Sequence, residues 1–478
     1  MTAPSVDSIS SQSEMPNIYS FKQTLSFPNM DSLDVYRCLK EPNKESFLIE
    51  FNYNDRRTTV ISCEPLITMK AARDQKVEYK IGQRKVQINS FSAIEVLRLL
   101  SRSITTCFDS TDSFAQSLFS IFSYDSVRQF EKRLFRQDKR EKMPDIWATI
   151  PKSAVILDLD SRECNIVVNT FSPEYGLEEL KRLVKSYSNS LKKGISPMID
   201  NCLAKSAVPK YNVTMKEFCD AVHKAKEYIK SGDIFQVVLS IESAVETQLS
   251  AEEIYHKMVQ VNSNTTNYII ETDSFSIVGA SPEILIEKND NKCIIKPLAG
   301  TIHHSGGKDE SKEKELLSNE KDCAEHRMLV DLARNDLGRV CKWGTVLPKK
   351  LMHVEYYNNV MHIVSEVIGE IGEEFDSFDL FKAGFPAGTM VGAPKIRAME
   401  IIDELENIPR GFYSGGVGFF TPKGNINSYI NIRSLTLIDK VAYARAGAGI
   451  VYDSIPEQEY NECFTKLKNA LTALKCGV

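Results

Sequence analysis

The first 190 residues alternate between short apolar strands and amphipathic helices. Runs rich in apolar and β-branched residues occur at 47–51, 154–157 and 165–168, and each has the length of a single strand. Between 178 and 191 the apolar residues recur at helical spacing. This pattern predicts an N-terminal region, residues 16–190, in which strands and helices are mixed.

The pattern is interrupted at two places. Residues 1–15 are rich in serine and show no regular apolar spacing, which predicts a flexible tail. Residues 191–210 include a glycine and two prolines and follow neither the helical nor the strand period, which predicts a linker. From 211 to 478 longer strand-like and helical segments return, separated by glycine turns and without an internal repeat. The chain therefore divides into a tail, two structured regions and a linker between them.

A carboxylate interrupts the apolar face of the helix predicted at 312–332. Glu325 has apolar residues three, four and seven positions ahead of it, and these positions share one face of a helix. Burying a carboxylate on such a stripe is costly unless a cation meets it. We therefore expect Glu325 to bind either a metal ion or an arginine, and Arg334 and Arg433 are the candidate arginines.

The last helix presents a second pair of carboxylates. We predict that it begins at Ser454, whose spacing to Glu457 is that of a capping box. At the border of its apolar arc, Glu459 and Glu462 are three residues apart and point the same way. Lys466 lies on the same side of this helix.

Such carboxylates are suited to Mg²⁺, which is usually held by one or two carboxylates together with water and substrate oxygens. The candidate ligands are Glu325, Asp322 one turn before it, Glu459 and Glu462. However, acidic residues one turn apart are also common on solvated helix faces, where Glu462 would simply pair with Lys466. Spacing alone favours this second interpretation.

Composition excludes several classes of function. Of the 478 residues, 59 are Lys or Arg and 64 are Asp or Glu, so the net charge of −5 offers no basic field for nucleic acid. No apolar stretch approaches the roughly 18 residues of a membrane span, and the N-terminus does not resemble a signal peptide. The 11 cysteines are scattered without a CxxC pair, as expected for reduced thiols. We expect a globular, cytoplasmic protein that binds neither nucleic acid nor membrane.

Glycine-rich turns at 298–301, 384–389, 392–395 and 446–449 could bring backbone N–H groups close to an anion. None is a Walker A or dinucleotide fingerprint, and each one alone is better explained as an ordinary tight turn. His362 alternates with apolar neighbours, and a lone histidine in such a strand is more often a hydrogen-bonded core residue than a catalyst.

Several motifs, taken together and in order, resemble those of the chorismate-utilising enzymes, most of all anthranilate synthase component I. They lie at 232–240, 324–336, 360–365, 385–389, 392–395 and 445–451. The N-terminal region matches more weakly. The resemblance implies an α+β fold, a large mixed-sheet sandwich with flanking helices, which binds chorismate and Mg²⁺.

The resemblance also implies roles for individual residues. The predicted metal ligands are Glu325 and Glu462, with Glu459 and Asp322 beside them. The predicted chorismate contacts are Gly300, Thr301, Tyr413, Arg433, Gly447, Ala448 and Gly449. The predicted catalytic residues are Glu283, His362, Gln236 and Thr301. Glu283 matches the general acid that protonates the departing C4 hydroxyl, and His362 matches the histidine assigned to pyruvate elimination.

Two positions distinguish branches of this family. Members that add water carry a lysine base where this chain has Gln236, and a neutral amide cannot deprotonate water. Aminodeoxychorismate synthases carry a lysine where this chain has Ala299. Both positions indicate ammonia as the nucleophile and anthranilate as the product.

The expected activity is that of the synthase subunit of anthranilate synthase, a Mg²⁺-dependent lyase of tryptophan and aromatic amino acid biosynthesis. Chorismate and ammonia would give anthranilate and pyruvate through 2-amino-2-deoxyisochorismate. The ammonia would come from glutamine through a separate glutamine amidotransferase subunit, anthranilate synthase component II. Two alternatives remain open: a 2-amino-2-deoxyisochorismate synthase of a secondary pathway, and an inactive relative that acts as a binding or regulatory subunit.

Feedback control is expected to differ from that of tryptophan-inhibited members. These carry a Leu-Leu-Glu-Ser motif, which reads Leu-Ile-Glu-Phe at 48–51 in this chain. They also carry an Asn-Pro-x-Pro-Tyr-Met segment, and both of its prolines are missing at 262–267. Phe51 removes a hydroxyl that would contact the inhibitor, so we expect weak or absent inhibition by tryptophan.

Overall fold

The computed structural model describes residues 16–53, 55–72, 76–82, 84–88, 92–105, 108, 110–131, 134, 143–193, 208–262, 265–304, 308–357 and 360–474. The predicted tail at 1–15 and most of the predicted linker lie outside these residues. The predicted strands are confirmed as parts of β2 (Ser46–Tyr53), β7 (Ile146–Asp158) and β8 (Glu163–Thr170). The predicted helix at 178–191 is part of α5 (Pro173–Lys193).

Two long strands build the sandwich. β3 (Arg56–Ala71) pairs antiparallel with β7, and the register shifts between Ser62 and Ile67. Before these shifts β3 also pairs with β2, and after them it pairs with β4 (Val77–Ile81). β7 divides in the same way between β8 and β6 (Leu118–Phe122). Because bulges bend strands, β3 and β7 pass from one sheet into the other.

The first sheet joins both predicted regions of the chain. Its strand order is β1–β8–β7–β3–β2–β11–β12–β21–β22–β10, and β9 and β18 pair with different parts of β10. Its further strands are β1 (Tyr19–Leu25), β9 (Lys210–Tyr211), β10 (Gln236–Glu246), β11 (Thr266–Glu271), β12 (Ser276–Ser281), β18 (Gly392–Ala393), β21 (Ser434–Ile438) and β22 (Val441–Ile450). The pairing of β2 with β11 connects a strand from before the linker to one from after it.

The second sheet runs in the order β5–β4–β3–β7–β6–β19–β20–β13–β14–β17, and both β15 and β16 pair with β17. Its further strands are β5 (Arg84–Ile88), β13 (Ile284–Asn289), β14 (Lys292–Ile295), β15 (Leu298–His303), β16 (Leu347–Tyr357), β17 (Val360–Glu370), β19 (Gly415–Phe420) and β20 (Ile426–Asn431). All of these pairings are antiparallel, and the predicted α+β sandwich is confirmed.

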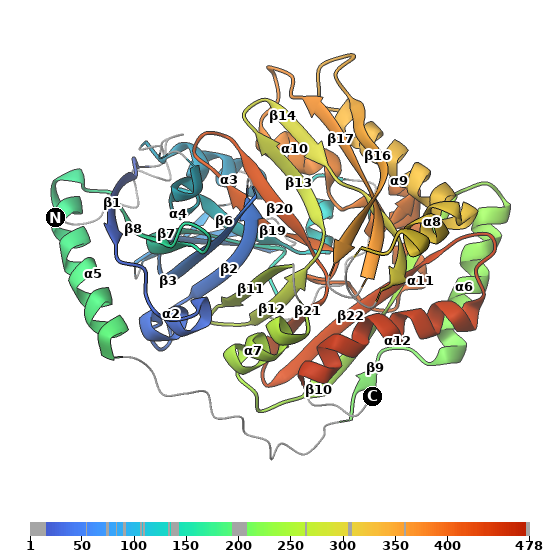
Figure 1. Cartoon of the computed structure of the whole chain (residues 1–478), viewed down its shortest axis with the longest axis horizontal. Coiled ribbons are helices and arrows are strands. Elements are labelled where there is room, and N and C mark those ends of the chain that lie inside the picture. The colour runs from blue at the N-terminus through green and yellow to red at the C-terminus, as the bar shows by residue number, and fades with distance from the viewer. Residues whose placement is uncertain are drawn as a thin grey trace.

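Apolar residues fill the space between the sheets and the layer beneath the helices. An aromatic core that includes Phe47, Phe119, Trp147 and Phe419 lies between the two sheets. The opposite face of the first sheet is covered by α2 (Ser32–Leu39), α5, α7 (Ala251–Val261) and α12 (Pro456–Ala473) (Figure 1). The remaining α-helices longer than four residues, within the described ranges, are α3 (Ala93–Arg102), α6 (Met215–Lys230), α8 (Glu310–Ser318), α9 (Glu320–Gly338), α10 (Ser377–Gly384) and α11 (Lys395–Leu405).

Two predictions of helix boundaries were wrong. The helix predicted at 312–332 is divided into α8 and α9, because the side chain of Asn319 accepts from the Asp322 N–H and starts a new helix. The predicted capping box at Ser454 does not form. Instead, α12 begins at Pro456, and the Ser454 hydroxyl oxygen accepts from the Val451 N–H at 3.0 Å.

Candidate active site

Strands β10 and β22 bring Gln236 and Gly449 together at the floor of the site. The two strands pair so that Gly449 lies opposite Val238. Gln236 is 2% exposed, and its side-chain amide donates to Glu325 Oε1 across 2.7 Å. A methyl group on Gly449 would lie 2.6 Å from the Gln236 amide nitrogen, so only glycine leaves room for this contact. The contact between the amide of β10 and the carboxylate of α9 thus has a steric basis.

The neighbouring positions of β22 differ in the direction of their side chains. A methyl group on Gly447 would lie 3.0 Å from the Tyr413 hydroxyl, so Gly447 and Tyr413 face the same space. The Lys466 ammonium donates to the Gly447 carbonyl at 3.0 Å. In contrast, the methyl group of Ala448 is buried in the apolar core. Ala448 can therefore face the site only through its backbone.

His362 is held by the segment that carries Gly300 and Thr301. Its Nδ1 lies 2.8 Å from the Gly300 carbonyl oxygen and 3.1 Å from Thr301 Oγ1. Since a carbonyl oxygen only accepts, Nδ1 carries the hydrogen and Nε2 is the nitrogen that can take up a proton. Burial is the main cause that lowers the pKa of His362 to about 4, and Arg433 and Lys466 lower it further. The imidazole is therefore neutral at pH 7.

Glu283 has the protonation behaviour of a general acid. Its side chain is 8% exposed, and this burial raises its pKa to about 7. The Thr389 hydroxyl donates to Oε1 at 2.9 Å and, like Arg433 and Lys466, lowers this pKa. A substantial fraction of Glu283 is consequently protonated at neutral pH, as proton donation requires.

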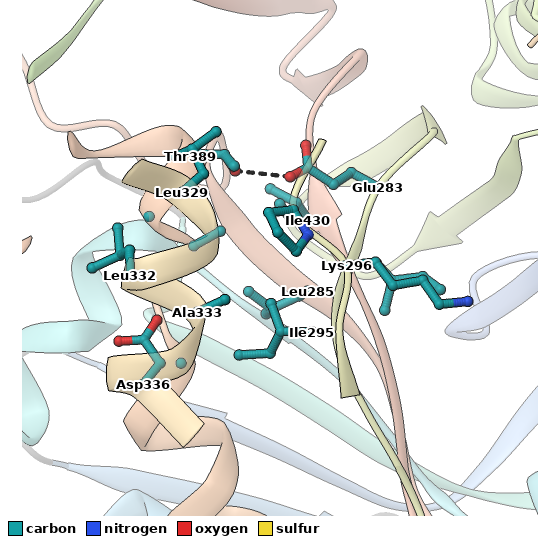
Figure 2. Close-up of a pocket in the computed structure, with 15 residues that line it drawn as sticks. Glu283, Leu285, Ile295, Lys296, Leu329, Leu332, Ala333, Asp336, Thr389 and Ile430 are labelled. Carbon is teal, nitrogen blue, oxygen red and sulfur yellow. Dashed lines mark hydrogen bonds between the residues drawn. The ribbon is translucent and has the colours of Figure 1, made fainter. Parts of the chain in front are cut away.

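A small cavity extends from Glu283 into the protein. Figure 2 shows Glu283 and Thr389 at one end and Asp336 of α9 at the other, with apolar side chains between them. The Lys395 ammonium pairs with Asp336 at 2.7 Å and also donates to a backbone carbonyl. The cavity provides the apolar surroundings that burial of Glu283 requires.

The four predicted metal ligands lie on α9 and α12, two helices close enough for a charge on one to act on a carboxyl group of the other. Lys466 of α12 acts electrostatically on Glu325, and Lys321 of α9 acts on Glu459. Burial raises the pKa of both carboxyls, and the neighbouring acids Asp322 and Glu462 raise them further. A cation between the helices would relieve both effects.

As an alternative to metal binding, ion pairs were predicted for Glu325 and for Glu462, and one of the two forms. Neither candidate arginine pairs with Glu325: Arg334 pairs with Asp331 at 2.7 Å, and the acid that acts electrostatically on Arg433 is Glu283. The expected pair between Glu462 and Lys466 does form, at 2.8 Å. Glu325 is thus left with the neutral amide of Gln236 as its hydrogen-bond donor.

The described residues contain no cluster of three or more His, Cys, Asp or Glu side chains arranged around a metal position. Mg²⁺ does not need such a cluster, since one or two carboxylates with water and substrate oxygens suffice. Glu325 is a half-buried carboxylate that forms no salt bridge with any described residue, and Glu462 is exposed on α12. The donor chemistry therefore fits Mg²⁺ held by Glu325 and Glu462, with Asp322 and Glu459 beside them.

Two cations border the site. Arg433 is exposed and has a backbone φ of 48°, a conformation that costs a non-glycine residue about 1 kcal/mol. The side chain of Lys466 is 52% exposed, yet its charge acts on Glu283, His362 and Tyr413. Sequence reasoning treated Lys466 only as a partner of Glu462. Its position four residues after Glu462 on one helix face was the signal that it shares the site.

The structure thus brings the predicted residues of β10, β15, β17 and β22 together with the acids of α9 and α12. It also adds Thr389, which sequence reasoning did not select although it ends one of the glycine-rich turns. A neutral histidine, a partly protonated acid, two exposed cations and two acidic helices are thus gathered at one site, where the cations are suited to anionic groups of a ligand. The architecture is that of an α+β sandwich enzyme.

The chain belongs to the family of chorismate binding enzymes, whose model matches residues 72–472. It is 36% identical to anthranilate synthase component 1 of Acetivibrio thermocellus over 437 residues, which cover 88% of this chain and 87% of that protein. This confirms the resemblance found in the sequence motifs and makes the chain a chorismate-utilising enzyme.

Solved structures agree with this assignment. Anthranilate synthase component I from Streptococcus pneumoniae TIGR4 has a TM-score of 0.77 at 27% identity and covers 94% of this chain and 99% of its own. MenF, the menaquinone-specific isochorismate synthase from Escherichia coli, has a TM-score of 0.71 at 17% identity, covering 96% and 95%. The second likeness shows a common fold only.

Proposed function

We propose that the chain is the synthase subunit of an anthranilate synthase, which converts chorismate and ammonia to anthranilate and pyruvate through 2-amino-2-deoxyisochorismate. The observation that supports ammonia as the nucleophile is the buried amide of Gln236, whose nitrogen is committed to Glu325. This neutral group cannot remove a proton from water, whereas ammonia is nucleophilic without a base. The family and its anthranilate synthase relatives support the same reaction.

In the proposed reaction, Glu283 donates its proton to the C4 hydroxyl of chorismate, which leaves as water while ammonia adds at C2. Arg433 and Lys466 bind the substrate carboxylates, for which their exposed cationic groups are suited. His362, neutral and with Nε2 as its basic nitrogen, assists removal of pyruvate from the amino intermediate. The hydrogen bond from Nδ1 to Gly300 holds the imidazole in this tautomer.

We include Mg²⁺ in the proposal, held by Glu325 and Glu462 with Asp322 and Glu459 nearby. When bound, Mg²⁺ would neutralise charge on a substrate carboxylate and on the two acidic helices. The Glu462 carboxylate also pairs with Lys466 at 2.8 Å.

The proposed partner is a glutamine amidotransferase subunit, anthranilate synthase component II, which would release ammonia from glutamine. The "component 1" names of the relatives support a two-component enzyme. We also propose a cytoplasmic location, since the described cysteines are free thiols. Within the described residues, no helix combines the length and the apolar character needed to cross a membrane.

The test uses the purified chain with chorismate, Mg²⁺ and either an ammonium salt or ammonium-free buffer. Mass spectrometry should detect anthranilate and pyruvate only with ammonium, and a Glu283→Gln variant should form neither. Accumulation of 2-amino-2-deoxyisochorismate alone would favour the synthase of a secondary pathway. Formation of isochorismate would contradict the assigned nucleophile, and the absence of any product would favour an inactive binding subunit.

A further inference from the structure

The hydrogen bond between Thr389 and Glu283 has a defined direction. The Thr389 hydroxyl donates to Glu283 Oε1 at 2.9 Å, as the dashed line in Figure 2 shows. Among the described residues, this carboxyl oxygen is the acceptor that the Thr389 hydroxyl meets. The contact joins the candidate general acid to a residue that none of the predicted roles includes.

Each partner is fixed by its own wall of the site. The Glu283 carbonyl accepts from the Ile430 N–H at 3.0 Å, which ties the acid to β20. Thr389 belongs to the short helical turn η3 (Gly388–Met390). A methyl group on Gly388 would lie 2.0 Å from a Leu332 side-chain carbon, so this turn packs closely against α9. The Thr389 hydroxyl and the Glu283 carboxyl therefore lie within hydrogen-bond distance because the backbone segments that carry them are fixed by these contacts.

A carboxylic acid carries one proton on one of its two oxygens. The oxygen that accepts a hydroxyl hydrogen is thereby favoured as the carbonyl oxygen, and the acid proton is favoured on the other. We propose that Thr389 is the positioning residue of the general acid. Its hydroxyl donates a hydrogen bond to Oε1 of Glu283, so that the acid proton is carried by Oε2. This inference rests on the proposed role of Glu283 as acid.

Charged groups around Glu283 determine what removal of the hydroxyl should do. Burial is the largest influence on its pKa and raises it. The hydrogen bond from Thr389 is the largest lowering influence, ahead of Arg433 and Lys466. The cavity beyond the acid is also lined by Lys296 and by Asp336, and Asp336 is paired with Lys395. Replacing the hydroxyl with a methyl group should therefore raise the pKa of Glu283, while these other groups stay in place.

The test compares Thr389→Val, which keeps the shape but removes the donor, with Thr389→Ser, which keeps the donor. We expect kcat of Thr389→Val to fall about tenfold at little change in KM, because the proton is no longer directed. The alkaline limb of its kcat/KM profile for chorismate should move to higher pH. Thr389→Ser should restore both quantities toward wild type. Equal losses in the two variants, or an unmoved limb, would overturn the proposal.

A measurement without substrate separates this proposal from the proposed function. Difference infrared spectroscopy of the chain, with Glu283→Gln as reference, follows the C=O band of the protonated Glu283 carboxyl as pH rises. We expect this band to titrate at higher pH in Thr389→Val than in wild type. If it does while wild type makes no anthranilate, the function fails and the positioning stands. An unchanged midpoint in an active enzyme would refute the positioning alone.

Discussion

The side-chain amide of Gln236 on β10 and the carboxylate of Glu325 on α9 form a hydrogen bond of 2.7 Å. The residue proposed to select ammonia over water as nucleophile thus contacts a proposed metal ligand directly. The amide nitrogen is the donor, so the amide oxygen is the end that can accept from an N–H of ammonia. Nucleophile choice and metal binding are therefore expected to respond to changes at either residue.

Replacing the proposed metal ligand Glu325 should weaken Mg²⁺ binding. We expect Glu325→Gln to weaken Mg²⁺ affinity or activity roughly 10- to 100-fold, because an amide oxygen replaces an anionic ligand. Calorimetric titration with Mg²⁺ and activity at several Mg²⁺ concentrations measure both effects. The matched control is Asp331→Asn, an exposed acid of the same helix that pairs with Arg334. Full activity of Glu325→Gln in excess chelator would refute the metal assignment.

A lysine at position 236 should open the route to water. We expect Gln236→Lys to form some isochorismate or salicylate beside anthranilate, since a lysine amine can act as a base. The yield should be small, because Glu325 beside it would hold the new lysine in its charged form. Product analysis by mass spectrometry is the measurement. An unchanged set of products would show that Gln236 is not the sole determinant of the nucleophile.

Protonation of Glu283 should set the alkaline limit of turnover. Its pKa of about 7 means that the active, protonated form is lost as pH rises through 7. The pKa of His362 is about 4, so His362 stays neutral over the same range. We expect kcat/KM for chorismate, measured at saturating ammonia, to fall toward tenfold per pH unit above the pKa of Glu283, because kcat/KM reports the pKa values of the free enzyme. A kcat/KM that still rises above pH 8 under these conditions would contradict the role of Glu283 as acid.

The absence of a side chain at Gly449 should matter for catalysis rather than for stability. In Gly449→Ala the new methyl group would displace the Gln236 amide, whose nitrogen it would approach to 2.6 Å. We expect a loss of activity of roughly 100-fold, since small displacements of reacting groups cost that much. Gly338→Ala is the control, because nothing lies within 4 Å of a methyl group there. Equal activity of the two variants would show that the floor tolerates the added group.

Tryptophan should inhibit weakly or not at all. Phe51 is 3% exposed, and its ring packs against Phe114 with centroids 5.0 Å apart, so an apolar core contact stands where inhibited relatives carry a serine. A binding site that lacks a polar partner loses affinity, because buried polar groups of the ligand stay unpaired. Titration of tryptophan against ammonia-dependent activity tests this expectation. Inhibition at micromolar concentrations would show that Phe51 does not disable the pocket.

Sequence patterns and motifs predicted much of this structure. Apolar runs located β2, β7 and β8, because strand burial leaves a local signature. The break at Asn319 and the start of α12 at Pro456 were missed, since caps depend on which side chain meets which N–H in three dimensions. The hydroxyl of Thr389 and the position of Lys466 relative to Glu283 depend on contacts between distant segments, which spacing along one helix or turn does not contain.

The pairing of β2 with β11 has a consequence for how the chain is made. A ribosome releases β2 with one flank unpartnered, and its partner follows more than 200 residues later. The same delay affects β6, which waits for β19. Unpaired strand edges attract other chains, and sheets joined over such distances form slowly. Newly synthesised protein is therefore expected to depend on chaperones until β19 has emerged, and its yield should respond more to growth temperature than the stability of the finished fold would suggest.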